Sequence, residues 1–401
     1  MFSDDNIPNI NLLTICELSQ HKVVYKCYFF RRMKRIIVSG GGTGGHIYPA
    51  VAVAEALKRK WGDEVEILFV GAEGKMEMEK IPALGYRIEG LPVAGLQRRL
   101  TLKNLALPFK VIKSIRRAKS IIRNFGADIV VGFGGYASAP VLWAAQRLGI
   151  PTIIQEQNSY AGLTNKLLAK RAKRICVAYD KMDRFFPAER IVMTGNPLRG
   201  RFTADGSNRN EALAYYGFND TMPVILVVGG SLGTRTLNEM MKAWIATLDG
   251  TAPVQVIWQT GKFYEKEMQA FLKAHPTRNI WQGAFIERMD YAYAAADVVL
   301  SRSGACTVSE LCLVAKPTIF VPSPNVAEDH QTKNAMALVE KGAAEMVRDS
   351  EAVAKGMAEA VRLATDEARR ESLAVNIAAL AIADSADRVV EQIARELEKV
   401  K

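Results

Sequence analysis

The stretch GGGTGGHIYPA at residues 40–50 places five glycines in six positions and follows them with a histidine. The short run before it, IIVS at 36–39, predicts a buried strand, and the helical spacing of the apolar residues after Tyr48 predicts a helix. Glycine at this density weakens regular structure, which indicates that a tight turn or a closely approaching ligand requires backbone without side chains here. Because backbone N–H groups and the helix macrodipole both favour negative charge, the stretch predicts a site for a phosphate or another anion.

Predicted strands and helices alternate from Arg35 onward, which indicates parallel sheets covered on both faces. The pattern restarts at PVILVVGGSLGTRTLNEM (223–240) after a polar stretch, and the tail from Glu351 is predicted to be helical. We therefore expect an α/β protein of two doubly wound domains facing a cleft, into which the glycine turns open at the carboxyl ends of the strands. The predicted strands are 35–39, 66–70, 128–132, 152–155, 174–177, 191–194, 224–228, 254–258, 280–282, 297–300 and 318–321.

The length of 401 residues suits two domains of ordinary size. We expect a leader over 1–34, an N-terminal domain over 35–200, a linker region over 201–221 and a C-terminal domain over 222–401, whose last helix could pack back on the N-terminal domain. The leader lacks the apolar core of a signal peptide, and Met33 stands just before the first predicted strand. We therefore expect either a native start at Met33 or a disordered arm.

The cysteines and the overall charge narrow the class of protein further. Five cysteines without a C-x-x-C pair indicate reduced thiols in a cytosolic compartment rather than disulfides or a structural zinc site. The longest uncharged stretch, 129–146, contains three glycines and a proline, so no segment is predicted to span a membrane. The formal net charge of +11 favours an anionic partner, which could be nucleic acid, an acidic membrane face or a phosphorylated substrate.

Residues 96–127 form a one-sided basic stretch, since no acidic residue occurs between Glu89 and Asp128. Leucines, isoleucines and a phenylalanine interleave with the positive charges, and this pattern predicts docking on an anionic membrane leaflet. Nucleic-acid binding is the alternative, which the scarcity of aromatic residues disfavours, and an ordinary solvated helix face accounts for part of the charge. The basic residues are Arg98, Arg99, Lys103, Lys110, Lys113, Arg116, Arg117, Lys119 and Arg123.

A second glycine turn, GFGGYASAP at 132–140, follows another predicted strand of the first half. Two such turns in one domain suit a pyrophosphate held between two loops, although tight turns for strand–helix packing alone are the alternative. Gly40, Gly42 and Gly45 also satisfy the dinucleotide pattern G-x-G-x-x-G. The second strand, however, ends at Gly71 without the acidic residue that a dinucleotide site expects.

His46 stands directly after the first glycine turn and is one of four histidines. A lone histidine is usually structural or merely exposed. Imidazole titrates near neutral pH, however, so a histidine beside an anion site is a candidate general base.

The second half offers a separate set of candidate binding residues. GGSLG at 229–233 begins a predicted helix and could hold a phosphate through Ser231 and backbone N–H groups. SRSGACTVSEL at 301–311 is another strand-to-helix turn, in which Glu310 could accept hydrogen bonds from both hydroxyls of a ribose, or simply be a solvated helix residue. In NPLRG at 196–200, Arg199 offers a cation for a diphosphate or, alternatively, for an interdomain salt bridge.

The sequence contains no metal-ligand pattern: no D-x-D pair after an apolar strand, no H-x-x-x-H and no Cys/His group at zinc spacing. We therefore expect neither a metal nor a cofactor. Negative charge on a leaving group would then be stabilised by helix N-termini, Arg199 and backbone amides.

Six stretches together resemble the MurG family, the peripheral-membrane N-acetylglucosaminyltransferases that convert lipid I to lipid II in peptidoglycan synthesis. They are GGGTGGHIYPA, GFGGYASAP, QEQNSYAG, GNPLR, GGSLGTRTLNE and SRSGACTVSELCLVAKPTIFVPSPNVAEDHQTKNA. The resemblance runs in order from about Arg35 to the C-terminus and does not include the leader. It implies the GT-B fold, which is two Rossmann-like domains around a cleft, and inverting, metal-independent chemistry.

The resemblance implies that the donor, UDP-N-acetylglucosamine, lies mainly on the C-terminal half. Glu310 would hold the ribose, Ser231 and Arg199 the diphosphate, and Gln331 and Asn158 the sugar. The residues around the uracil and the helix N-terminus would be Ile286, Ala305, Cys306, Thr307, Val308 and Ser309.

On the acceptor side, the resemblance implies that His46 removes the proton of the 4-hydroxyl of the N-acetylmuramoyl sugar of lipid I. That oxygen would attack the anomeric carbon from the face opposite UDP and form a β-1,4 link. The donor and acceptor sites would meet at Thr43, Gly44 and Gly45. The pyrophosphate of lipid I would lie between loops containing Gly41, Gly42, Gly134, Gly135 and Tyr136.

Two positions depart from the pattern of the family: Leu232 stands where glutamine is common, and Gln155 stands where histidine is frequent. The first removes a side chain that could help at the diphosphate, and the second leaves His46 with fewer rivals as base. A UDP-sugar epimerase of the same fold and a non-catalytic membrane-bound nucleotide-sugar sensor are the alternatives. The resemblance further implies a peripheral position on the cytoplasmic face of the inner membrane and association with other cell-wall synthesis proteins, but no nucleic-acid partner.

Overall fold

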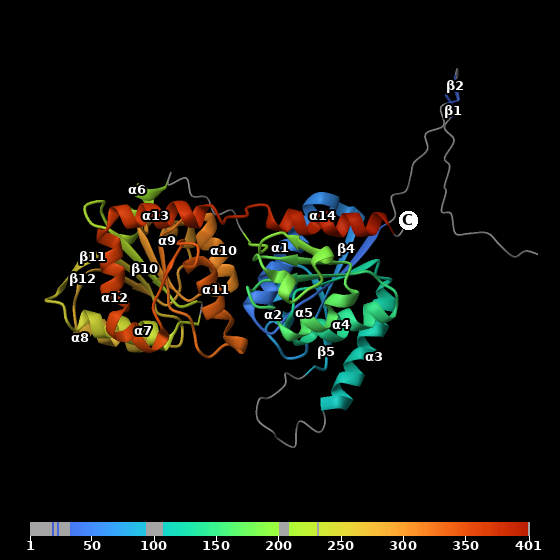
Figure 1. Cartoon of the computed structure of the whole chain (residues 1–401), viewed down its shortest axis with the longest axis horizontal. Helices are drawn as coiled ribbons and strands as arrows, with labels where there is room; N and C mark the ends of the chain where they lie inside the picture. Colours follow the sequence, from blue (N-terminus) through green and yellow to red (C-terminus); the bar gives the residue numbers. More distant parts are fainter. Residues whose placement is uncertain are drawn as a thin grey trace, which may run out of the picture.

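The computed structural model describes residues 18–19, 22–23, 33–93, 107–199, 208–230 and 232–399. Figure 1 shows two α/β units side by side along the longest axis of the molecule. Most of the expected leader and part of the expected linker lie outside the described residues. Within the leader, β1 (Leu18–Ser19) and β2 (Lys22–Val23) form an antiparallel pair.

The N-terminal unit is built on a parallel sheet whose described strands run in the order β5-β4-β3-β6-β7-β8-β9. The chain moves outward from β3 to β5 and then returns to β6 on the other side of β3. Open α/β sheets bind ligands where the strand order reverses in this way, beyond the carboxyl ends of the strands. The strands are β3 (Lys34–Ser39), β4 (Val65–Ala72), β5 (Arg87–Leu91), β6 (Ile129–Gly132), β7 (Thr152–Glu156), β8 (Arg174–Val177) and β9 (Ile191–Met193).

Both faces of this sheet are buried, because successive residues of a strand point to opposite sides. Ile36 and Val38 of β3 join the apolar cluster of α1, whereas Ile37 between them joins the cluster of α3 and α4. A strand buried on both faces needs a continuous apolar run, and the sequence has one there. The helices of this unit are α1 (Gly44–Trp61), α2 (Glu77–Ala83), α3 (Leu107–Phe125), α4 (Gly135–Arg147) and α5 (Leu163–Leu168).

The C-terminal unit repeats this plan, with described strands in the parallel order β12-β11-β10-β13-β14-β15. The order reverses between β10 and β13, so the turns after these two strands meet at one edge of the sheet. The strands are β10 (Val224–Val228), β11 (Thr251–Gln259), β12 (Arg278–Gly283), β13 (Val298–Ser301), β14 (Thr318–Phe320) and β15 (Glu345–Met346).

Helices cover both faces of the second sheet as well. Ile225 and Val227 of β10 pack into the cluster of α7 and α12, and Leu226 packs on the opposite face into the cluster of α10 and α11. The helices are α6 (Arg209–Tyr216), α7 (Arg235–Ile245), α8 (Glu265–Ala274), α9 (Met289–Ala295), α10 (Ala305–Leu313), α11 (His330–Val339), α12 (Asp349–Thr365) and α13 (Glu367–Ala378).

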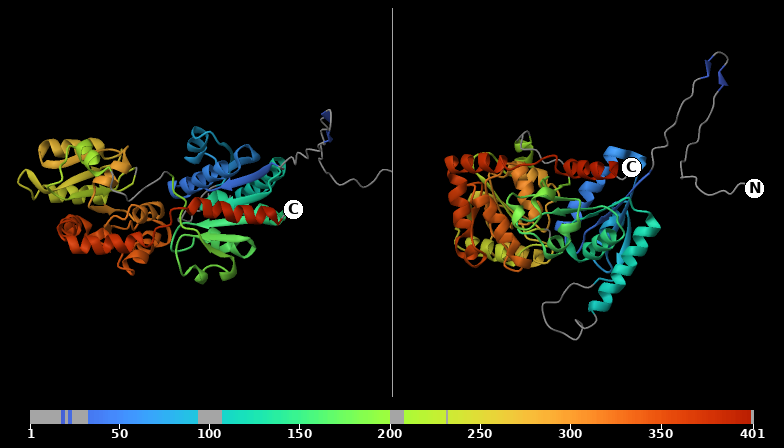
Figure 2. Two further views of the ribbon diagram at one scale, coloured as in Figure 1. Left: turned by 90° about the horizontal axis from the view of Figure 1, so that it is seen from above. Right: turned by 45° about the vertical axis from the view of Figure 1, so that its right-hand side comes forward.

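The last helix, α14 (Ser385–Glu398), crosses from the C-terminal unit and lies against the N-terminal one. The two further views in Figure 2 show the same red helix on the N-terminal unit. Val389, Val390 and Ile393 of α14 are buried in the apolar cluster that contains Ile36 and Val51. The C-terminal segment is therefore part of the N-terminal core.

The expected fold class, two Rossmann-like parallel-sheet domains, is confirmed. β5 and β15 were not predicted from the sequence, and neither was the short pair β1 and β2. β5 has the sequence RIEGL and lies at the edge of its sheet, where a strand does not need a continuous apolar run. In the described ranges, no helix combines the length and the apolar character needed to cross a membrane.

Candidate functional site

The two glycine turns of the N-terminal domain lie together where its strand order reverses, after β3 and after β6. Gly135 has a φ of +80°, and a Cβ on it would overlap the carbonyl group of Gly41. Glycine is therefore required for the two turns to approach this closely. Neither α1 nor α4 has a side-chain cap among the described residues, so their first N–H groups can serve an anion.

His46 lies in the first turn of α1, between the two glycine turns. Its Nδ1 is 3.1 Å from the carbonyl oxygen of Gly41 and 3.2 Å from Oγ1 of Thr43. A carbonyl oxygen can only accept, so Nδ1 carries the proton and donates it to Gly41, which leaves Nε2 as an acceptor. Nε2 faces the second turn, since a Cβ on Gly134 would lie 3.2 Å from it. This is the tautomer that a general base at this place requires.

Burial lowers the pKa of His46 below its ordinary value of 6.5. The hydrogen bond to Gly41 raises this pKa, nearby His330 lowers it and Glu77 raises it, each by less than burial does. The imidazole is therefore neutral at pH 7 and able to accept a proton.

The expected pyrophosphate cradle is partly occupied by the protein itself. The N–H of Gly42 donates to Oε2 of Glu77 at 3.1 Å, so this amide does not serve an external anion. Tyr136, 56% exposed, stands in the first turn of α4. Binding of a pyrophosphate between these turns stays a prediction.

A cavity of about 780 Å³ opens in the C-terminal domain at the carboxyl edge of its sheet. Cavities of this size are typical of small-molecule sites. It lies between the turns after β10 and β13, where the strand order reverses. The expected donor residues Thr307, Glu310 and Gln331 all line it, and α7 and α10 begin beside it.

Glu310 is a partly buried carboxylate in the wall of this cavity. Tyr293 Oη donates a hydrogen bond to its Oε2 at 3.3 Å. Burial raises the pKa of Glu310 to about 7, against a smaller lowering by this hydrogen bond. A carboxylate removed from water and provided with one donor can gain from further donors, as the two hydroxyls of a ribose would supply.

Of the other residues expected to bind the donor, Ile286 and Arg199 do not line this cavity. The backbone N–H of Ile286 donates to Gln259, which lines the cavity. Arg199 forms an ion pair with Glu55 of α1 at 3.5 Å, and both residues belong to the N-terminal domain, so this salt bridge does not join the two domains. Ser231 lies outside the described residues.

Two arginines that were not predicted from the sequence also line the cavity. Arg235 is the first residue of α7, directly after the glycine turn. Arg302 follows β13; its Nη1 contacts Asp349, while its Nε is buried without a partner among the described residues. Both guanidinium groups suit a diphosphate. Their positions next to glycine turns were the signal available in the sequence.

Buried asparagines connect the two domains beside these sites. Asn196 of the N-terminal domain donates to Oγ of Ser309 at 3.0 Å. Asn334 of the C-terminal domain accepts from the N–H of Ser159 at 2.9 Å and donates to Oδ1 of Asn158 at 3.1 Å. Asn158 and Ser309, both expected to bind the donor, therefore lie at the domain boundary.

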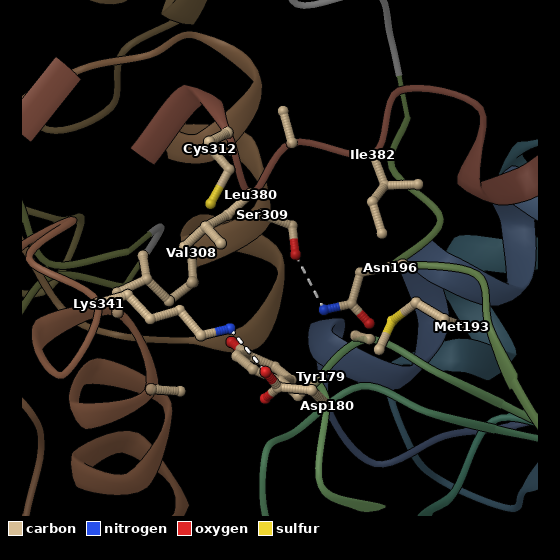
Figure 3. Close-up of a pocket in the computed structure, with 16 residues that line it drawn as sticks. Tyr179, Asp180, Met193, Asn196, Val308, Ser309, Cys312, Lys341, Leu380 and Ile382 are labelled. Carbon is tan, nitrogen blue, oxygen red and sulfur yellow. Dashed lines mark hydrogen bonds and ion pairs between the residues drawn. The ribbon is translucent and has the colours of Figure 1, made fainter. Parts of the chain in front are cut away.

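Figure 3 shows a smaller cavity, of about 250 Å³, between the domains. Lys341 and Asp180, 2.9 Å apart, form an ion pair across it. Val308 and Ser309 line this cavity, whereas Thr307 and Glu310 line the larger cavity of the C-terminal domain, because α10 turns different faces to the two spaces. The remaining expected residues, Ala305 and Cys306, occupy the first turn of α10.

Gln155, which departs from the pattern of the family, is fully buried in an amide network. It donates to Oδ1 of Asn196 at 3.2 Å and accepts from Nε2 of Gln157 at 2.5 Å. An amide cannot titrate, so this position supplies no base beside His46. In the part of the chain that the structure describes, no group of three or more His, Cys, Asp or Glu side chains is placed to hold a metal ion.

Two Rossmann-like sheets facing each other are the architecture of the GT-B class, and comparisons with known proteins identify the chain as a glycosyltransferase of that class. Residues 36–177 match the glycosyltransferase family 28 N-terminal domain, and residues 224–389 match the family 28 C-terminal domain. The crystal structure of MurG from Acinetobacter baumannii is similar, with 30% identity, a TM-score of 0.73, and coverage of 90% of this chain and 99% of that one.

Curated relatives are closer in sequence. The UDP-N-acetylglucosamine--N-acetylmuramyl-(pentapeptide) pyrophosphoryl-undecaprenol N-acetylglucosamine transferase of Parabacteroides distasonis is 52% identical, over 92% of this chain and 100% of its own length. The enzyme of the same name from Bacteroides thetaiotaomicron is 51% identical, over 90% of this chain and 96% of its own length. The chain belongs to this family, the MurG glycosyltransferases.

Proposed function

We propose that the protein transfers N-acetylglucosamine from UDP-N-acetylglucosamine to lipid I and so forms lipid II for peptidoglycan synthesis. The 4-hydroxyl oxygen of the N-acetylmuramoyl sugar attacks the anomeric carbon from the face opposite UDP. The new C–O bond forms as the bond to the β-phosphate oxygen breaks, the hydroxyl proton passes to Nε2 of His46, and UDP leaves with the electron pair. The configuration at the anomeric carbon is thereby inverted.

The observation that carries this proposal is the position of a neutral histidine opposite a nucleotide-sized cavity. His46 presents Nε2 at the reversal point of one sheet. His330, which acts electrostatically on His46, begins α11, and the next residue, Gln331, lines the donor cavity. A base on one domain therefore faces a donor site on the other, which is the arrangement that transfer between two bound substrates requires.

Charge on the departing UDP is stabilised by the donor domain. Arg235 and Arg302 supply cations, and the uncapped starts of α7 and α10 supply N–H groups. Glu310 accepts the ribose hydroxyls, and Gln331 contacts the sugar.

Release of UDP from UDP-N-acetylglucosamine tests the proposed reaction. We expect release only when a lipid I analogue is present, together with a β-linked disaccharide product. Conversion of the donor to its 2-epimer without any acceptor would instead favour the epimerase, and absence of turnover with a lipid I analogue would favour the sensor.

Membrane docking by α3 is a second part of the proposal. Figure 1 shows the start of α3 extending beyond the rest of the N-terminal unit. Val111 and Ile112 there are 46% and 49% exposed, and Lys110, Lys113 and Arg116 around them are exposed. Apolar side chains among cations suit an anionic leaflet, which supports a peripheral position on the cytoplasmic face of the inner membrane. Arg98, Arg99 and Lys103 lie outside the described residues, and association with other cell-wall synthesis proteins stays a prediction.

Reversing the charges of Lys110, Lys113 and Arg116 to glutamate is expected to weaken binding to anionic vesicles by at least two orders of magnitude. Each basic residue near such a surface contributes about 1 kcal/mol, which added salt screens. Vesicle co-sedimentation measures the effect, while turnover of a short-chain soluble acceptor should not change. Arg123→Glu at the other end of α3 is the matched control. Unaltered sedimentation of the triple variant would make the basic face a solvated surface.

A further inference from the structure

Glu77, the first residue of α2, is a fully buried carboxylate that the proposed reaction does not use. Its Oε1 accepts from the N–H of Ala72 at 3.0 Å, and its Oε2 accepts from the N–H of Gly42 at 3.1 Å. Among the described residues, no lysine or arginine forms an ion pair with it. A buried carboxylate is costly unless donors satisfy it, so backbone N–H groups hold this one in place.

The surrounding chain leaves room for this carboxylate. A Cβ on Gly41 would overlap Oε1 and the carboxyl carbon of Glu77, and a Cβ on Gly71 would lie 2.6 Å from Cγ of Glu77. Glycine at these two positions, one in the first glycine turn and one in β4, therefore lets Glu77 lie directly under the turn that carries His46.

Glu77 and His46 bind opposite ends of one peptide group. The N–H of the peptide between Gly41 and Gly42 belongs to Gly42 and donates to Glu77. The carbonyl of the same peptide belongs to Gly41 and accepts from Nδ1 of His46 at 3.1 Å. Carboxylate, peptide and imidazole therefore form a continuous line of two hydrogen bonds.

We propose that Glu77 is a positioning residue that acts on His46 through this peptide group, as the carboxylate of a catalytic triad acts directly on its histidine. The inference rests on the proposed role of His46 as base. Hydrogen bonds in series polarise one another, so a carboxylate at the N–H end makes the carbonyl oxygen a stronger acceptor for Nδ1–H. The stronger bond fixes the tautomer that leaves Nε2 free and favours the imidazolium formed during transfer.

The charges that face His46 act in opposite directions. Glu77 on α2 raises the pKa of His46, and His330 on α11 lowers it, while burial has the largest effect and also lowers it. Loss of the Glu77 charge is therefore expected to lower the pKa of His46 further, with a weaker base as the result.

The test is an NMR titration of the imidazole ring of His46 in the full-length protein, with the signal assigned by its absence in His46→Asn. Glu77→Gln keeps the shape of the side chain but removes its charge. We expect the pKa of His46 to fall in Glu77→Gln and kcat to fall about tenfold or more, the scale on which an outer hydrogen-bond partner of a functional histidine acts. The acidic limb of the pH profile of kcat should move to lower pH. Glu79→Gln, an exposed carboxylate of the same helix, should leave both unchanged.

A merely structural role predicts a different outcome. If Glu77 only pins the turn, Glu77→Gln lowers kcat or the melting temperature but leaves the pKa of His46 and the acidic limb in place, and the proposal is overturned. Should Glu77→Gln not fold, Gly71→Ala, which displaces the Glu77 side chain, must lower the pKa of His46 in its place.

A double-mutant cycle separates this inference from the proposed function. Since Glu77 acts through His46, adding Glu77→Gln to His46→Asn should lower kcat no further than His46→Asn alone. A further large fall would show that Glu77 acts elsewhere. Normal turnover by His46→Asn would end the role of His46 as base, whereas the titration would still report whether Glu77 and His46 are coupled.

Discussion

Replacing His46 by alanine is expected to lower kcat about 10²–10⁴-fold, the usual contribution of one positioned proton acceptor. The affinity for UDP-N-acetylglucosamine should change little, because the cavity proposed for this donor is lined by residues of the other domain. Steady-state kinetics with a lipid I analogue measures the first effect, and calorimetry with the donor alone measures the second. His275→Ala, a histidine in an exposed loop, is the matched control.

The activity is also expected to depend on pH through His46. A base must be deprotonated to act, and burial holds the pKa of His46 below 6.5. With donor saturating, kcat/KM for the acceptor should therefore stay level through neutral pH and fall only as the pH drops below 6.5. His46→Asn can still donate a hydrogen bond to Gly41 but cannot take the proton, so it should be nearly as slow as the alanine variant. Near-normal turnover with an intact acidic limb would make His46 a support of the glycine turn.

Replacing Glu310 by alanine is expected to weaken donor binding about 10- to 150-fold. This range corresponds to about 1.5–3 kcal/mol for hydrogen bonds made to a charged group. Calorimetric titration with UDP-N-acetylglucosamine measures the loss, and Glu371→Ala, an exposed carboxylate of α13, is the control. Unchanged affinity would remove Glu310 from the donor site.

The affinity for the donor should also depend on pH through Glu310. Burial raises its pKa to about 7, so in the free protein the carboxyl group is protonated below pH 7 and ionised above it. The ionised form is the better acceptor for ribose hydroxyls. Affinity should therefore rise as the pH increases through 7 and level off above it. Glu310→Gln should lack this dependence while it keeps part of the binding.

Sequence patterns predicted the parts of this protein that depend on neighbouring residues. The run IIVS before a glycine turn predicted β3, and the glycine turn predicted that His46 lies at the start of a helix. The same reasoning placed Glu310 in a helix, because a strand, a turn and a helix follow one another within one segment. Each of these depends on a periodicity that spans fewer than about 20 residues.

The parts that were missed depend on contacts between distant segments. Glu77 reads as an ordinary helix residue, and only the fold brings it to Gly42, 35 positions earlier in the chain. The ion pair of Arg199 with Glu55 of α1 was not predicted either, and a role of Arg199 at a diphosphate stays a prediction. A side chain with several rotatable bonds has more than one partner within reach, and local sequence does not select between them.

The return of α14 to the N-terminal domain has a consequence for how the chain folds during synthesis. Arg59 of α1 and Asp387 of α14 form a hydrogen bond across 328 positions of sequence. Ribosomes add about 5–20 residues per second, so about 15 to 65 s separate the appearance of the two helices. Until α14 has been made, the apolar residues of α1 and of the first sheet that it will cover stay exposed to solvent. The first domain to emerge is thus the last to be completed, and the nascent chain carries an open apolar face from the synthesis of β9 until that of α14.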